Sequence, residues 1–274
     1  MNRNIFHIGF FHSASTLLQK NIFTNITGYK FVNYNKKLIN QSISYMPKDF
    51  GKYFYYEKNN IFKEIRKYKK PFIYSSEAFS HLHEHNSYYK TKLYNENPFI
   101  GLVNLAKFLS ESDSHLLFII RSQTSVINSY FKRWSHLYKN ENDLFIDFPY
   151  KRNLHKSKRT LAFSKFGMLY LNTFNHRLNL SIILNFIDKN RIHIIPYEYL
   201  LTDKKKFITD LGKVFNKDLN FLEGKLSERI NSSQASKGKT LSKNYKNLLK
   251  DEFAYDNEIL DKTFNLGLKK LGYY

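Results

Sequence analysis

The sequence predicts a three-layer α/β fold, in which helices cover both faces of a central parallel β-sheet. Short apolar runs rich in Ile and Phe recur along the chain, and helical patterns separate them. Strands covered by helices on both faces have this composition, and their alternation with helices is typical of a parallel sheet. With 274 residues, 42% of them hydrophobic, the chain can bury one such core. We therefore expect a single domain over residues 1–274, with a core of about 4–215 and an irregular C-terminal helical cap of about 219–274.

Four strands are expected, at residues 4–10, 71–76, 115–121 and 191–197. Helical patterns lie between them, at residues 17–25, 56–70, 98–111, 125–137 and 166–189. Gly28 is a plausible stop for the first helix. The cap is basic and helical in two parts, at residues 241–253 and 257–271, whereas residues 30–55 and 136–165 show no clear period. Polar residues follow or close three of the strands, at 12–16, 77 and 121, and ligands bind at this edge of parallel sheets.

The chain is strongly basic, with 44 Lys and Arg against 23 Asp and Glu and a formal net charge of +21. Such an excess indicates an anionic partner: nucleic acid, acidic lipid, a polyanionic glycan or a phosphate-rich cofactor. Part of it follows from a composition that AT-rich codons favour. The charge is spread along the chain, which argues against a nucleic-acid-binding tail, so we expect no specific nucleic acid. Peripheral association with an anionic membrane surface stays open.

The composition also argues against cysteine-dependent functions and against a membrane-spanning or secreted protein. The chain has no Cys, which excludes disulfides, thiol catalysis and cysteine-ligated metals. No stretch approaches the roughly 20 apolar residues that span a bilayer, and the N-terminus does not resemble a signal peptide. We therefore expect a cytoplasmic location.

The segment Phe11-His12-Ser13-Ala14-Ser15-Thr16 joins the first strand to a helix. The first amides of a helix lack intrahelical partners and face anions with a favourable dipole. Three hydroxyl groups add donors, and Ala14 keeps the backbone approachable. The segment therefore predicts an anion site, and the alternative is an ordinary serine-capped helix.

The same segment is close to the nucleotide-binding pattern G-x4-G-K-[ST] of P-loop enzymes, read as Gly9-x4-Ala14-Ser15-Thr16. Ser15 stands where that pattern has Lys, and Ala14 replaces the second Gly. A nucleoside triphosphatase needs this Lys on the β- and γ-phosphates. An ordinary P-loop NTPase or kinase is therefore disfavoured, although it stays an alternative.

Residues 7–19, HIGFFHSASTLLQ, resemble the 5′-phosphosulfate-binding loop of sulfotransferases that use 3′-phosphoadenosine 5′-phosphosulfate (PAPS). That loop has the form PK-[ST]-G-[ST]-[ST], and Ser13, Ser15 and Thr16 match its hydroxyl positions. The resemblance implies a P-loop-like fold, and it implies that backbone amides from Ser13 to Leu17 hold the 5′-phosphosulfate.

Three positions depart from the family loop: Phe11 replaces Pro, Ala14 replaces Gly, and His12 stands where the family has Lys. The family Lys carries a fixed positive charge beside the leaving phosphate oxygen. An imidazolium at His12 could do the same work, because an adjacent anion favours the charged form. Two alternative hypotheses are that another cation supplies this charge, and that activity is reduced or lost.

Two further segments resemble the part of the family site that binds the 3′-phosphate. Arg121 closes a strand and Ser129 follows eight residues later in a helix, and a guanidinium suits phosphate because it is always charged and binds bidentately. Lys237, Gly238 and Lys239 belong to a basic loop that resembles the segment closing over this phosphate. The alternatives are a surface Arg with a buried Ser, and an exposed linker.

Glu77 follows the second strand, and in carbohydrate-acting and bacterial sulfotransferases a Glu in a similar context is the general base. The alternatives are a helix-capping Glu, or a base among His81, His83 and His85. We expect no metal, because sulfuryl transfer needs none. Glu198 lies in a YE-x-L turn that resembles the end of the family's last core strand, and we expect it to be structural.

The resemblance implies a PAPS-dependent sulfotransferase of the bacterial, carbohydrate-acting type, with 3′-phosphoadenosine 5′-phosphate (PAP) as product. Sulfuryl transfer would be in line, to a hydroxyl acceptor that is most simply a sugar of a glycan or glycolipid. Glu77 and His12 would be the catalytic residues. The competing hypotheses are a P-loop kinase or NTPase, and a catalytically weakened nucleotide- or polyanion-binding protein of the same fold.

Overall fold

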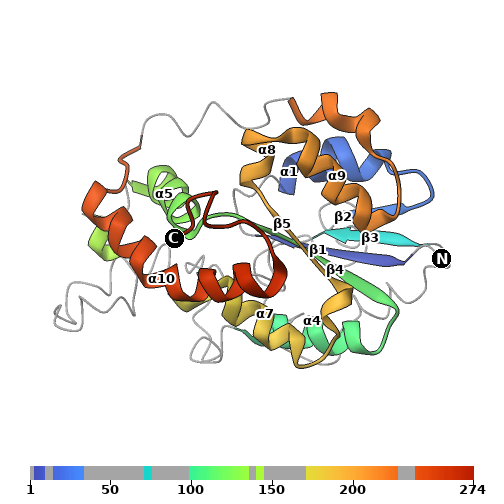
Figure 1. Ribbon diagram of the computed structural model, residues 1–274, viewed down its shortest axis with the longest axis horizontal. Helices are drawn as coiled ribbons and strands as arrows, with labels where there is room; N and C mark the ends of the chain where they lie inside the picture. Colours follow the sequence, from blue (N-terminus) through green and yellow to red (C-terminus); the bar gives the residue numbers. More distant parts are fainter. Residues whose placement is uncertain are drawn as a thin grey trace, which may run out of the picture.

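The computed structural model describes residues 3–9, 15–33, 71–75, 99–135, 140–144, 171–227 and 238–274. Within these ranges, five strands form one sheet in the order β2-β3-β1-β4-β5, and every pair is parallel. The strands are β1 (Asn4–Gly9), β2 (Lys30–Asn33), β3 (Phe72–Ser75), β4 (Ser114–Ile120) and β5 (Ile192–Pro196). Helices lie above and below the sheet (Figure 1), so the predicted three-layer α/β fold is confirmed.

The central strand β1 lies between β3 and β4, with His7 level with Ser75 and Gly9 level with Ile119. From β1 the chain fills the β2–β3 side of the sheet, and it then crosses to add β4 and β5 on the other side. The strand order therefore reverses beside β1. In open parallel sheets this switch point opens a crevice beyond the carboxyl ends of the strands, where ligands bind.

Side chains of the strands alternate between two hydrophobic clusters, one on each face of the sheet. Phe6 and Ile8 of β1 belong to the first cluster, and Ile5 belongs to the second. The first is covered by α4 (Ile100–Ser110), α5 (Gln123–Trp134), α7 (His176–Leu184) and α10 (Lys243–Phe264). The second is covered by α1 (Ser15–Leu17), η1 (Leu18–Ile22), η2 (Phe23–Asn25), α8 (Glu198–Thr202), α9 (Lys204–Phe215) and η10 (Asn220–Ser227). The described residues also include short 3-10 helices at η6 (Glu141–Asp143), η8 (Leu171–Phe174) and η9 (Lys189–Arg191).

In the described part of the chain, four helices are preceded by a residue whose side chain accepts a hydrogen bond from the first turn. Ser122, Asn175, Asp203 and Ser242 cap α5, α7, α9 and α10 in this way. Such caps satisfy donors that the helix itself leaves open, and each contributes about 1 kcal/mol. Ser122 matters most for the site, because it starts α5 two residues after β4 ends.

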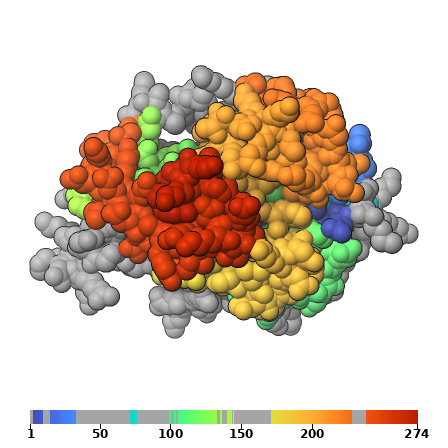
Figure 2. All heavy atoms as spheres, in the orientation of Figure 1, coloured from blue at the N-terminus to red at the C-terminus, as the bar shows by residue number. Residues whose placement is uncertain are grey.

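The C-terminal segment differs from the expected irregular cap. The sequence predicted two helices, whereas α10 is a single helix of 22 residues whose buried face includes Leu249, Phe253, Asn257 and Leu260. It packs on α5 and α7, and Figure 2 shows the segment spread against the α7 and α8–α9 regions. The expected break at 254–256 is absent because Phe253 and Asn257 continue one buried helical face.

Two other differences concern the first third of the chain. Strand β2 lies in the stretch without clear period, and its four residues KFVN are too few to show alternation. The first helix begins at Ser15 rather than Leu17, and it passes from α through π to 3-10 geometry. Gly28 has a φ of 82°, which agrees with the expected stop. None of the helices in the described part of the chain is long and apolar enough to cross a membrane.

Candidate functional site

Three segments meet at the carboxyl edge of the sheet: the start of α1 after β1, the end of β3 at Ser75, and Arg121 after β4. Several predicted site residues lie outside the described residues, namely Phe11, His12, Ser13, Ala14, Glu77 and Lys237, together with His81, His83 and His85. The described members of the predicted site are Ser15, Thr16, Leu17, Arg121, Ser129, Gly238 and Lys239.

The start of α1 is packed closely against the end of β1. Ser15 is buried, and its Oγ has no hydrogen-bond partner among the described residues. Thr16 is partly exposed, while Leu17 belongs to the core. A Cβ added at Gly9 would lie 3.3 Å from the Ile119 oxygen and 3.4 Å from Ser15 Oγ, so glycine permits this approach. The hydroxyl of Ser15 is therefore a buried polar group at the switch point, where an oxyanion could satisfy it.

A buried polar network lies beside Ser15 and joins β1 to β3. His7 Nδ1 lies 2.7 Å from Ser75 Oγ, and Gln19 Nε2 donates to the same oxygen at 2.9 Å. Burial lowers the pKa of His7 to about 3, so its imidazole is neutral near pH 7. The network fixes the end of β3, two residues before Glu77. We did not predict this role for His7, although a His inside an apolar run was a visible signal.

Arg121 occupies the corner between β4 and α5. Its guanidinium carbon lies 4.7 Å from the centre of the Tyr197 ring, an arrangement that stabilises the cation. Tyr197 follows β5, and its amide donates to the Ile120 oxygen at 2.7 Å. The oxygen of Arg121 itself accepts a hydrogen bond from His176 Nε2 at 2.9 Å. Both the side chain and the backbone of Arg121 are therefore held at the edge of the sheet.

The peptide after Arg121 is held by Glu198, for which the sequence predicted only a structural role. The Ser122 amide donates to Glu198 Oε1 at 2.9 Å, and the Tyr273 hydroxyl donates to Oε2 at 2.6 Å. The part played by Tyr273 was missed, because nothing in the sequence links residue 273 to residue 121.

Residues 238–240, the described end of the basic loop, meet the last turn of α5. The Lys239 amide donates to Ser135 Oγ at 3.0 Å. A Cβ added at Gly238 would lie 1.6 Å from the Lys132 oxygen, so only glycine fits there. Ser129 is partly exposed and lies one turn before Lys132. The structure thus brings the described end of this loop to the helix that carries Ser129.

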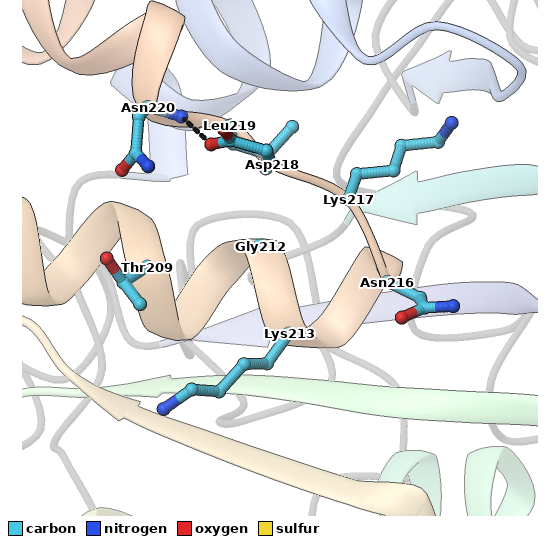
Figure 3. Close-up of a pocket in the computed structure, with 8 residues that line it drawn as sticks. All are labelled: Thr209, Gly212, Lys213, Asn216, Lys217, Asp218, Leu219 and Asn220. Carbon is cyan, nitrogen blue, oxygen red and sulfur yellow. Dashed lines mark hydrogen bonds between the residues drawn. The ribbon is translucent and has the colours of Figure 1, made fainter.

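A cavity of about 410 Å³ lies elsewhere, at the end of α9 and the turn that follows (Figure 3). It is lined by Thr209, Gly212, Lys213, Asn216, Lys217, Asp218, Leu219 and Asn220. None of these is a predicted site residue. The carboxyl end of a helix disfavours anions, and Asp218 adds a negative charge. This cavity is therefore a poor place for a nucleotide despite its two lysines.

Comparison with known proteins identifies the fold. No protein-family model matches the chain, and no curated protein sequence matches it. Among solved structures, a sulfotransferase from Alicyclobacillus acidocaldarius matches at a TM-score of 0.54 and 12% identity, over 98% of each chain. The sulfotransferase domain from the curacin biosynthetic pathway matches at 0.45 and 12%, over 97% of this chain and 98% of that one. Mouse sulfotransferase SULT7A1, solved with PAP, matches at 0.39 and 14%, over 82% of this chain and 62% of that one. The resemblance seen in the sequence is confirmed at the level of architecture: the chain has the sulfotransferase fold.

Proposed function

We propose that this protein is a PAPS-dependent sulfotransferase, which moves a sulfuryl group to a hydroxyl of a glycan or glycolipid sugar. The observation that carries the proposal is the position of Arg121. It stands at the carboxyl end of β4, next to the switch point, with its guanidinium over Tyr197 and Ser129 in the helix that follows. A cation fixed there suits the 3′-phosphate, which an ordinary nucleoside triphosphate does not have.

The residues around the switch point fit the nucleotide. Ser15 Oγ is buried and lacks a partner among the described residues, so it suits an oxyanion, and Arg121 supplies positive charge. In the proposal, the segment from Phe11 to Leu17 binds the 5′-phosphosulfate, and Ser129 and residues 237–239 assist Arg121. Bound PAPS supplies an activated sulfuryl group, and PAP is the product.

The acceptor proton is assigned to Glu77. Ser75 is fixed by His7 and Gln19, so the chain leaves β3 from a rigid point only two residues before this carboxylate. A positioned carboxylate that takes the proton as the new sulfur–oxygen bond forms typically contributes 10²- to 10⁴-fold in rate. His12 offsets the negative charge that develops on the leaving oxygen, in the role that the family gives to Lys.

Calorimetry of the full chain with PAP and with Mg²⁺–ATP tests the proposal. We expect PAP to bind and ATP to bind more weakly without turnover. Arg121→Ala should weaken PAP binding roughly 10- to 100-fold, because a charge-assisted contact contributes about 1.5–3 kcal/mol. Lys213→Ala is the control, since this exposed lysine pairs with Asp210 away from the site and should leave PAP affinity unchanged.

Other outcomes of this calorimetry, and of assays of sulfuryl transfer and DNA binding made beside it, would support the competing hypotheses. Magnesium-dependent ATP turnover would identify a P-loop kinase or NTPase. PAP binding without sulfuryl transfer to any sugar acceptor would identify a catalytically weakened binding protein of the same fold. Binding to DNA with steep salt dependence and no nucleotide preference would contradict the enzyme hypothesis. A PAP affinity that Arg121→Ala changes less than threefold would mean that the nucleotide site lies elsewhere.

The proposal also covers organisation and location. One domain, with a core of about 4–215 and a cap of about 219–274, would bind both substrates. The charge of +21 suits peripheral association with an anionic membrane surface, and in the proposal the enzyme is cytoplasmic and acts at the inner face of that membrane.

A further inference from the structure

We infer that Tyr273, acting through Glu198, is a positioning residue for Arg121, so that the C-terminal end of the chain sets selectivity for the nucleotide's 3′-phosphate. The inference rests on the proposed function and deepens it. It assigns to the last helix and its tail a role in cofactor recognition.

The carboxylate of Glu198 joins the Arg121 corner to the tail. One oxygen accepts the amide of Ser122, the peptide that directly follows Arg121, at 2.9 Å. The other accepts the hydroxyl of Tyr273 at 2.6 Å. Burial raises the pKa of Tyr273 well above 10, with the charge of Glu198 acting in the same direction, so the hydroxyl stays protonated and donates. Hydrogen bonds to a charged acceptor are about twice as strong as neutral ones.

A second set of contacts fixes the same corner from α10. Gln123 and Asn257 exchange amide hydrogen bonds at 2.9 and 3.0 Å, and both side chains are buried. Asn257 Nδ2 also donates to the backbone carbonyl oxygen of Tyr273 at 3.2 Å. The first residues of α5 and the backbone of Tyr273 are therefore tied to one point on α10, and Figure 1 shows the C-terminus beside α5.

The carbonyl of the same Arg121–Ser122 peptide is also held near this tyrosine. The Arg121 oxygen accepts from His176 Nε2, and the His176 ring lies 6.2 Å from the Tyr273 ring, centre to centre. The carbonyl of Arg121 and the amide of the next residue are thus both fixed by groups next to Tyr273. Moving the tyrosine would therefore disturb both the carbonyl and the amide of the peptide that joins Arg121 to Ser122.

The arrangement also controls the charge beside Arg121. Glu198 directly follows Tyr197, whose ring lies under the guanidinium, and Arg121 is close enough to oppose the rise in the pKa of Tyr273. Neutral donors engage both oxygens of Glu198. Without the Tyr273 hydroxyl, Glu198 Oε2 loses this hydrogen-bond donor. We then expect Oε2 to attract the Arg121 guanidinium, in competition with the 3′-phosphate of the nucleotide. The hydroxyl therefore directs the charge of Arg121 toward the ligand.

The test compares two nucleotides that differ only in the 3′-phosphate, PAP and AMP. Calorimetry of the full chain with each gives the ratio of the AMP and PAP dissociation constants. Tyr273→Phe keeps the buried ring and removes the hydroxyl, and we expect it to lower this ratio about tenfold with AMP affinity unchanged. Tyr274→Phe is the matched control, because its hydroxyl donates to Asp261 at 3.0 Å, and the ratio should stay at the wild-type value.

A double variant separates positioning from general support of the fold. Glu198→Gln keeps an oxygen for the Ser122 amide and removes the competing charge. In Tyr273→Phe/Glu198→Gln we therefore expect the ratio to recover to within threefold of wild type. A merely structural role for Tyr273 predicts that the double variant is at least as weak as the single one.

The outcomes distinguish this inference from the proposed function. A wild-type protein that binds PAP no better than AMP would overturn both. A wild type that prefers PAP, with a ratio that Tyr273→Phe leaves unchanged or a loss shared equally by PAP and AMP, would overturn the inference alone. Thermal unfolding of each variant without ligand reports any loss of folded protein, and nucleotide-induced shifts in Tm supply the ratio independently of the active fraction.

Discussion

The two sides of the switch point are built from opposite kinds of polar group. On the β4–β5 side, Arg121 and Glu198 are charged and are held by contacts that reach the last residues of the chain. On the β1–β3 side, His7 and Ser75 form a buried and neutral network whose imidazole does not take up a proton near pH 7. The charged side suits recognition of a phosphate. The neutral side suits precise placement of the segments that would carry out the chemistry.

The difference between the two sides bears on position 12, where this chain has His and the sulfotransferase loop that it resembles has Lys. Because burial keeps His7 neutral, it cannot supply the positive charge that the family obtains from a Lys in the first loop. Arg121 is committed to the opposite side of the switch point, over Tyr197. In the proposed site, the charge near the leaving oxygen would come from His12, or from a cation of the basic loop at residues 237–239 if that loop also reaches the 5′ end of the nucleotide.

The largest effect should come from Glu77→Gln, which tests the chemistry assigned to the β1–β3 side. We expect turnover to fall at least 100-fold, because the amide cannot accept the acceptor's proton, while PAP affinity stays within twofold of wild type. Initial rates and calorimetry measure the two quantities. Glu111→Gln is the control, an exposed carboxylate at the end of α4. Full turnover in Glu77→Gln would shift the role of base to a histidine at 81, 83 or 85.

On the neutral side, the buried His7 should make the free energy of unfolding fall at acid pH. The pKa of His7 is lowered from 6.5 to about 3 by burial, so below pH 6.5 the unfolded chain binds a proton that the folded one does not. Stability conferred by the neutral imidazole is complete above pH 6.5, and it falls as pH drops toward 3, by up to about 1.4 kcal/mol per pH unit. Urea unfolding between pH 7 and pH 4 measures this slope.

His7→Gln should reduce the slope by about one proton, while other buried histidines such as His176 maintain the rest. Ser75→Ala is the matched variant, because it removes the hydroxyl that His7 and Gln19 share and leaves the imidazole buried. It should cost about 1 kcal/mol at pH 7 and keep the wild-type slope. Equal slopes in wild type and His7→Gln would show that His7 is not the source of acid sensitivity.

The sequence predicted the layers and four of the five described strands, because their apolar runs carry a local signal. β2 was missed, since four residues with a charged end show no such run. The position of Arg121 was predictable from the end of a strand. The contacts that hold it were not, because Glu198, Tyr273 and His176 reach it from sequence distances of 55 residues or more. Long-range polar pairs have no periodicity to detect.

The same contrast applies to α10. Its two expected halves were a reasonable interpretation of local composition, but Phe253 and Asn257 share one buried face only when the helix continues. Asn257 was expected to begin the second helix, whereas it lies inside a single helix as a buried partner of Gln123. The contacts that the C-terminal segment makes with the charged side were therefore not predictable from the sequence.

The smallest functional effect should come from Gly238→Ala, which tests how firmly the basic loop is joined to the charged side. A Cβ at this position meets the Lys132 oxygen at 1.6 Å, so the loop must move away from α5 and lose the bond from Lys239 to Ser135. We expect a cost of about 1–3 kcal/mol in stability and a loss of only a few-fold in PAP affinity. Gly224→Ala is the matched control, because its Cβ meets nothing within 4 Å and should change neither quantity. If PAP affinity falls as far as in Arg121→Ala, the loop is a principal phosphate ligand and the charged side extends along the whole of α5. If it does not change at all, residues 237–239 belong to the fold and not to the site.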